Sequence, residues 1–150
     1  MLIDLARKVP RTVYVLNLVE LMERWGWYAL GSGVLTYYIQ SYFKLSAAEA
    51  GFAFSVFYAL LYLATLAGGR VADRFLGRTN AVALGLAMLA AGYFTMRRNA
   101  LLGASLVICG NGLFKPNMTT LLGEQIPRNA GKGAIDLAFW LFYGAINIGG

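Results

Sequence analysis

Long blocks of hydrophobic residues, separated by short polar segments, are the main pattern in this sequence. Residues 50–69 and 79–96 contain no charged residue, and residues 99–123 contain only Lys115. A further block runs to the last residue, and the first block, residues 12–43, contains three charges. About 20 residues of helix, at ~1.5 Å each, cross the ~30 Å hydrocarbon core of a bilayer. The blocks therefore predict membrane-spanning helices.

Polar segments divide the chain into four complete predicted spans and the beginning of a fifth. The predicted helices are residues 12–41, 49–71, 79–97, 100–122 and 134–150. The turn at residues 97–99 is so short that the third and fourth helices are expected to be an antiparallel pair. Because the last helix stops with the chain, we expect these 150 residues to be part of a longer protein, truncated in helix five.

Composition and charge support a membrane protein over a nucleic-acid-binding one. The chain is 59% hydrophobic and 13% charged, against about 25% charged in soluble domains. The net charge is +6, but the basic residues lie in short loops. Eight basic residues fall in loops on one side, namely Arg7, Lys8, Arg11, Arg70, Arg74, Arg78, Arg128 and Lys132. Three fall on the other, namely Lys44, Arg97 and Arg98. This bias predicts a multi-pass cytoplasmic (inner) membrane protein with a cytoplasmic N-terminus.

Polar residues from four predicted helices fall at similar depths in the membrane. Counted from the cytoplasmic end of each helix, Glu23 and Arg24 lie ~18–20 Å deep and Lys115 ~14 Å. On the same scale Tyr62 lies ~12 Å and Asn147 ~17 Å deep. The third helix carries only Gly, Ala, Leu and Met at this level, which indicates a structural role for that helix. The shared depth predicts a hydrated cavity in the middle of the membrane.

One face of the first predicted helix gathers its polar residues. Glu20, Arg24 and Tyr28 follow one another at intervals of four, and Glu23 and Trp27 lie beside them. Arg24 can pair with Glu20, which leaves Glu23 for another partner or for a proton. Burial favours the neutral carboxyl group and a nearby cation favours the carboxylate. A glutamate between these influences can exchange a proton as its partner moves.

Structural interpretations of the same residues stay open. In one alternative, the membrane-spanning part of the first helix does not begin until Trp25, since residues 25–43 are long enough to cross the bilayer. The charged residues would then lie at the membrane interface. Alternatively the charged pair only fixes helix packing. An arginine at mid-membrane costs roughly 2.5–3.5 kcal/mol on insertion scales, and Lys115 at matching depth favours a functional cavity.

Two other features have equally simple interpretations. Pro116 is either a passive bend or a hinge beside Lys115, made easier by the glycines at 110 and 112. Tyr58 and Tyr62 can be ordinary core aromatics. The loop after the second predicted helix reads GRVADRFLGR, and an ordinary positive-inside turn is one interpretation of it.

This loop also resembles the signature between the second and third helices of the major facilitator superfamily, with one additional residue before the last glycine. Its matching residues are Gly69, Asp73, Arg74, Gly77 and Arg78. Three further stretches narrow the resemblance. ELMERW with Tyr28 resembles the ExxER-aromatic motif of the proton-dependent oligopeptide transporter family. GLFKPN followed by GEQ resembles its GxxKP…GDQ pattern, and FYGAINIG resembles its FYxxINxG pattern, in the expected order.

The resemblance implies the N-terminal helical bundle of a major-facilitator fold, an all-α membrane protein with about five transmembrane helices present. It implies proton-coupled symport of di- and tripeptides by alternating access. The residues implied in proton coupling are Glu20, Glu23, Arg24 and Lys115. Those implied in substrate binding are Arg24, Trp27, Tyr28, Tyr62, Lys115 and Asn147. The loop residues from Gly69 to Arg78 are implied in gating. Trp27 stands where the family usually has a tyrosine.

The implied partners are peptide, protons, the lipid bilayer and the C-terminal half of the same transporter, which holds the peptide's amino end. A facilitator for another small organic or inorganic anion, or a non-transporting membrane fragment, remains an alternative. A membrane enzyme is disfavoured because the chain has no histidine, no metal-ligand cluster and no nucleophile–base pair. We therefore predict no catalytic residue, no cofactor and no metal.

Overall fold

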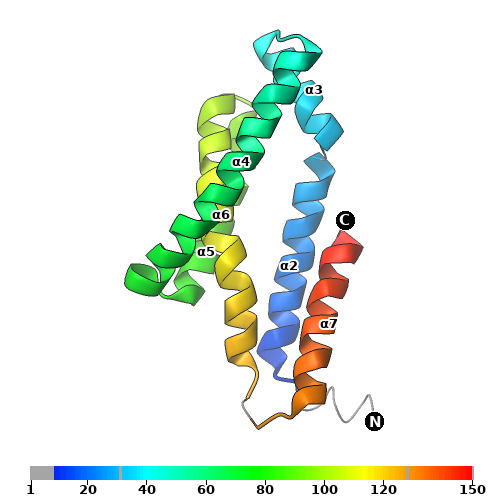
Figure 1. The fold of residues 1–150 in the computed structure, drawn as a ribbon, viewed down its shortest axis with the longest axis vertical. Coiled ribbons are helices and arrows are strands. Elements are labelled where there is room, and N and C mark those ends of the chain that lie inside the picture. The colour runs from blue at the N-terminus through cyan, green and yellow to red at the C-terminus, as the bar shows by residue number, and fades with distance from the viewer. Residues whose placement is uncertain (1–8, 31, 128, 150) are drawn as a thin grey trace. The chain divides into compact units, whose positions relative to one another are not determined.

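The computed structural model describes residues 9–30, 32–127 and 129–149, and every regular element among them is helical (Figure 1). The elements are α2 (Arg11–Leu30), α3 (Ser32–Phe43), α4 (Ala47–Val71), η1 (Ala72–Leu76), α5 (Arg78–Met96), α6 (Ala100–Gln125) and α7 (Lys132–Gly149). The predicted all-α class is confirmed. The range 12–41, predicted as one helix, contains two helices on either side of residue 31, which lies outside the described residues.

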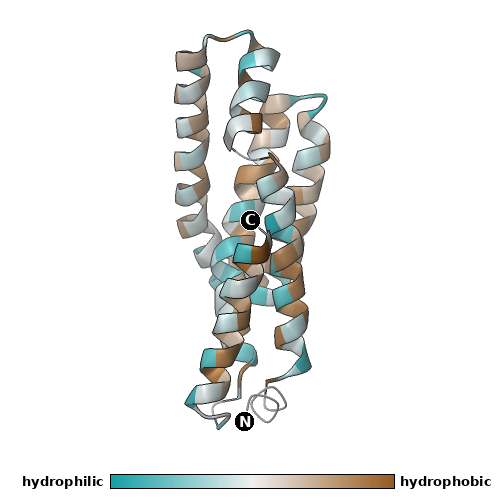
Figure 2. Cartoon of the chain, turned by 90° about the vertical axis from the view of Figure 1, so that its right-hand side faces the viewer, coloured by the Kyte–Doolittle hydropathy of each residue, from teal (hydrophilic) through white to brown (hydrophobic). Residues whose placement is uncertain are grey.

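Hydrophobic residues recur along the helices (Figure 2), and many large ones are exposed, as expected for contact with lipid. Phe52, Leu66, Phe94 and Trp140 are among the large hydrophobic side chains that are mostly exposed. Among the described residues, two helical stretches, Ala47–Leu76 and Arg78–Met96, are long and apolar enough to cross a membrane by length and composition.

Contacts divide the chain into two compact units, each described separately below. The first unit is Met1–Ala29 with Met118–Gly150, and the second is Leu30–Asn117. In the first unit, α2 and α7 lie side by side and run in the same direction (Figure 1). A Cβ atom added at Gly149 would lie 2.5 Å from Cβ of Arg24 and 2.9 Å from the carbonyl oxygen of Leu21. The two backbones therefore touch at the level of the charged residues.

The buried face of α7 explains this close approach. Its buried residues recur every three or four positions and are mostly small, namely Ala134, Ala138, Phe142, Ala145 and Gly149. Small residues let membrane helices approach closely. On α2, Trp25 Nε1 donates a hydrogen bond of 3.3 Å to the carbonyl oxygen of Ile148, which fixes the level of one helix against the other.

The second unit is held together by close glycine contacts along α6. A Cβ atom at Gly85 would lie 2.8 Å from the carbonyl oxygen of Gly110, and one at Gly92 would lie 3.0 Å from that of Gly103. The two pairs show that α5 and α6 are antiparallel, as the short turn predicted. On the other side of α6, a Cβ atom at Gly68 of α4 would collide with the backbone of Gly112.

Hydrogen bonds fix the ends of these helices. Ser46 caps α4 in a reciprocal capping box with Glu49, whose Oε2 accepts from the Ser46 amide at 2.8 Å. Near the turn between α5 and α6, the Tyr38 hydroxyl donates to the carbonyl oxygen of Met96, and that of Tyr42 donates to Arg98 at 3.3 Å. These tyrosines join α3 to the end of α5.

Candidate functional site

The charged residues of α2 form a compact, buried cluster. Glu20 is 0% exposed, and Glu23 and Arg24 are also buried. Arg24 donates two hydrogen bonds of 2.6 Å to Glu23, from Nε to Oε2 and from Nη2 to Oε1. Its Nε lies 3.6 Å from Oε1 of Glu20. A single guanidinium thus lies between two carboxylates in a site shielded from solvent.

The expected ion pair between Glu20 and Arg24 is present, and the structure adds a second carboxylate partner for Arg24. Glu20, at the favourable spacing of four residues, was expected to pair with Arg24 and to leave Glu23 for other partners. Glu20 does pair with Arg24, but Glu23 forms the shorter, bidentate pair with the same guanidinium. The physical reason is the shape of the guanidinium, whose parallel N–H groups match both oxygens of one carboxylate.

Aromatic rings lie beside the same guanidinium. Cζ of Arg24 lies 5.7 Å from the ring centroid of Trp27 and 5.9 Å from that of Tyr28. Both distances are within the range in which a cation is attracted to a ring face. The Arg24 Nη1 group makes no hydrogen bond within the part of the chain that the structure describes, so it is available to an anion.

Asn147 reaches the same level from α7. It is two residues from Gly149, whose backbone touches Arg24. Its Nδ2 donates to the carbonyl oxygen of Tyr143 at 2.8 Å, and its side chain is exposed. The amide oxygen is therefore left to accept from another donor. Within the first unit, the structure brings together the predicted residues of α2 and α7.

Lys115 and Tyr62 belong to the second unit. Nζ of Lys115 lies 5.8 Å from the ring centroid of Phe114, and its side chain is half-buried. Tyr62 is 71% exposed, which argues against a core role, and its ring lies 6.4 Å from that of Tyr58. Because these residues and Arg24 lie in separate units, convergence on one cavity stays a prediction.

The α6 helix continues through Pro116 from Ala100 to Gln125. Proline has no N–H to donate to the carbonyl of Gly112, and that carbonyl instead lies against Gly68. Asn117 supports the crossing, since its Nδ2 donates to the carbonyl oxygens of Leu113 at 2.7 Å and Gly68 at 3.4 Å. The passive bend and the hinge both remain compatible with this geometry.

The loop predicted to be a gate contains a π-helical turn. In η1, the amide of Gly77 donates to the carbonyl oxygen of Ala72 at 2.8 Å, five residues back. Gly77 has φ +72°, a conformation that favours glycine. Nη2 of Arg78 lies 3.1 Å from Oδ1 of Asp73. The π-turn holds one residue more than an α-helical turn would.

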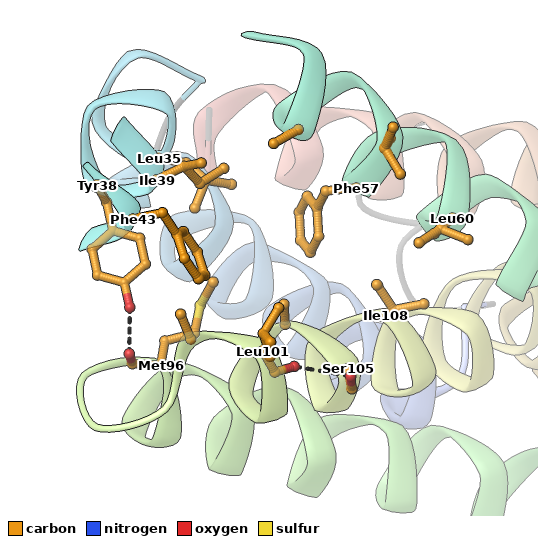
Figure 3. A pocket seen from close by; sticks show the side chains of 14 residues that line it. Leu35, Tyr38, Ile39, Phe43, Phe57, Leu60, Met96, Leu101, Ser105 and Ile108 are labelled. Carbon is orange, nitrogen blue, oxygen red and sulfur yellow. Dashed lines mark hydrogen bonds between the residues drawn. The ribbon is translucent and has the colours of Figure 1, made fainter. Parts of the chain in front are cut away.

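Sequence reasoning missed two features. The first is an apolar pocket of about 250 Å³ in the second unit (Figure 3). Leu35, Phe43, Phe57, Leu60 and Ile108 are among its lining residues, and none of the predicted site residues lines it. No signal in the sequence marks it, because its residues resemble those that face lipid.

The second missed feature is Asn17, one turn before Glu20 on α2. Its side chain is 8% exposed, and neither its amide oxygen nor its amide nitrogen has a hydrogen-bond partner among the described residues. An asparagine within the apolar run VYVLNLV, on the same face as Glu20, was the signal that could have found it. No cluster of potential metal ligands occurs in the described ranges.

The amino-acid sequence of this chain is similar to those of known membrane transporters. The family model of the Major Facilitator Superfamily matches residues 16–149. Dipeptide and tripeptide permease B of Shigella dysenteriae is 37% identical over 93% of this chain and 29% of its own length. Dipeptide and tripeptide permease A of Escherichia coli is 33% identical over 96% of this chain and 29% of its own length. The chain thus spans less than a third of these relatives.

Solved structures give the same result. A crystal structure of a POT family transporter in complex with a thioalcohol-conjugated peptide superposes with a TM-score of 0.84 at 29% identity, over 93% of this chain and 30% of that one. A POT family transporter in complex with 5-aminolevulinic acid superposes equally well, with a TM-score of 0.84 at 29% identity and the same coverage. The fold is therefore that of the N-terminal part of these integral membrane transporters.

Proposed function

Because the chain belongs to the Major Facilitator Superfamily, we propose that it forms the N-terminal bundle of a symporter that carries di- and tripeptides together with protons. The names of its relatives and the peptide in a structural neighbour support this substrate class. The observation that carries the proposal is the buried guanidinium of Arg24 between two carboxylates. The C-terminal half of the transporter would complete the site.

Charge balance gives the mechanism. Glu20, Glu23 and Arg24 together carry one net negative charge when all are ionised, which opposes binding of a peptide carboxylate. A proton on Glu20, whose contact with Arg24 is the longer one, makes the cluster neutral. The peptide carboxylate can then bind the Nη1 side of Arg24 while Glu23 holds the other side. Proton and peptide thus favour the same state of the cluster.

The remaining predicted residues complete the proposed site. Trp27 and Tyr28 flank the guanidinium and limit how the substrate carboxylate approaches. Tyr62, Lys115 and Asn147 are proposed to contribute to substrate binding from their own helices. Lys115 adds a second cation, which suits a substrate with a free carboxylate. Rocking of the two halves around the mid-membrane site would expose it to either side in turn.

Replacing Glu20 tests the proposal, because Glu20→Gln removes the proton-binding carboxylate while keeping the size of the side chain. The complete transporter is reconstituted in liposomes, and gradient-driven accumulation of a labelled dipeptide is compared with gradient-independent counterflow. We expect accumulation to fall about tenfold or more while counterflow persists, since a charge-assisted contact is worth ~1.5–3 kcal/mol. Glu49→Gln is the matched control, because Glu49 caps α4 and a glutamine preserves the cap. Undiminished accumulation by the Glu20 variant would sink the coupling role.

A small amino acid derivative is a second candidate substrate, since a structural neighbour holds 5-aminolevulinic acid. Competition for uptake distinguishes these two candidate substrates. Unlabelled dipeptides are expected to block uptake of labelled dipeptide at lower concentration than 5-aminolevulinic acid does. The reverse order would favour the second candidate.

The proposed orientation places the N-terminus and the loop containing η1 in the cytoplasm, in the inner membrane. The basic residues Arg70, Arg74 and Arg78 near this loop support it. A cysteine introduced at Arg98, in a variant with Cys109 replaced by serine, tests the orientation. We expect a membrane-impermeant thiol reagent to label it in whole cells, and protection from the reagent would reverse the orientation.

A further inference from the structure

Asn17 is a buried polar side chain for which the proposed mechanism has no role so far. It is 8% exposed, and both polar atoms of its amide lack a partner among the described residues. The great majority of buried polar side-chain atoms in folded proteins have a hydrogen-bond partner. Leaving a buried amide unpaired is costly, more so at membrane depth than near water. A partner in some state of the protein is therefore expected.

The position of Asn17 on α2 indicates that partner. Asn17 lies three residues before Glu20, and Arg24 lies four residues after it, so the three share one face of the helix. Glu20 is thus between an arginine one turn ahead and an amide one turn behind. Its carboxyl group is completely buried and lies 3.6 Å from Nε of Arg24.

The described ionisable residues on the elements that pack on α2 within the first unit are exposed. On α7 and the end of α6 they are Glu124, Lys132, Asp136 and Tyr143. The buried residues of these two segments are apolar or glycine. On α2 itself, Arg11 and Tyr14 are exposed, and Glu23 and Arg24 form the bidentate pair. Lys115 belongs to the second unit.

We propose that Asn17 is the hydrogen-bond acceptor for protonated Glu20, and this inference rests on the proposed function. A carboxylate only accepts hydrogen bonds, whereas a carboxylic acid also donates one. When a proton binds a Glu20 oxygen, the contact with Arg24 loses its ionic character, and the new O–H donates to Oδ1 of Asn17. When the proton leaves, Glu20 returns to Arg24. Asn17 is therefore a positioning residue that stabilises the proton-loaded state.

The pH dependence of transport tests this role. Asn17→Leu keeps the approximate size of the side chain and removes the acceptor. We expect the midpoint of gradient-driven dipeptide uptake against pH to move about 0.5–1 unit toward acid, because a stabilising hydrogen bond to the proton-loaded form is lost. Counterflow at acidic pH is expected to stay within about twofold. Asn17→Thr, which keeps a hydroxyl acceptor, is expected to recover part of the shift.

Val13→Ala is the matched control, since Val13 is also buried on α2, one turn further from Glu20. It is expected to leave the midpoint unchanged. If Asn17→Leu does not insert into the membrane, Asn17→Ala also removes the acceptor, and its pH midpoint of gradient-driven uptake is measured instead. An unchanged midpoint with intact counterflow overturns the inference, and so does an equal loss of counterflow and driven uptake without a shift. Absence of gradient-driven uptake by the unsubstituted transporter would instead overturn the proposed function itself, together with this inference.

Discussion

The crossing of α4 and α6 gives a stability prediction that does not depend on function. Gly68 faces the backbone of Gly112 and Leu113, where an added Cβ atom would meet backbone atoms that cannot rotate away. Gly51 lies on the same helix, and a Cβ atom added there would meet nothing within 4 Å. The two glycines therefore differ in packing while sharing the same helix and the same substitution.

Gly→Ala at an open helical position stabilises by ~0.5–1 kcal/mol, because alanine is the better helix former. Gly51→Ala is expected to show this gain. At Gly68 the same gain is opposed by overpacking, which costs ~1–3 kcal/mol or more when neighbours must shift. Gly68→Ala is thus expected to be destabilising by ~1–2 kcal/mol, so the two substitutions should differ in sign.

Thermal unfolding of the purified protein in detergent measures the difference, with the unsubstituted protein as reference. Gly68→Ala should lower the unfolding midpoint, and Gly51→Ala should raise it slightly. Equal midpoints for the two variants would refute the close approach of α4 and α6. A stabilised Gly68→Ala protein would refute the overpacking argument directly.

Two further predictions concern contacts already described. Arg24→Lys keeps the charge but loses the fork by which Nε and Nη2 hold Glu23 while Nη1 is proposed to bind the peptide, so the KM for dipeptide in counterflow is expected to rise about tenfold, and an unchanged KM would contradict the proposed role of Nη1. Tyr38→Phe removes the hydrogen bond to the carbonyl oxygen of Met96 and is expected to destabilise the protein by ~0.5–1.5 kcal/mol, measured by thermal unfolding, with the solvent-exposed Tyr42→Phe having the smaller effect.

Periodicity and apolar block length were sufficient to predict much of this structure. The sequence predicts helices where runs with at most one charge reach the length of a membrane span, and α4, α5 and α6 lie there because such runs must satisfy their backbone groups internally. The face that joins Glu20 to Arg24 followed from a spacing of four residues. The antiparallel pairing of α5 and α6 followed from the shortness of the turn between them.

The remaining features depend on contacts that spacing does not encode. Glu23, not Glu20, forms the short pair with Arg24 because the guanidinium turns its parallel N–H groups toward one carboxylate. The close approach of Gly149 to Arg24 depends on how α7 packs on α2. Asn17 was not predicted as a site residue because its amide is uncharged and hardly interrupts the apolar run around it.

The π-helical turn at Ala72–Leu76 has a consequence for how this loop can evolve. Its hydrogen bond spans five residues, so it holds one residue more than an α-helical turn does. A lineage can therefore gain or lose a single codon there while the apolar faces of α4 and α5 keep their orientation.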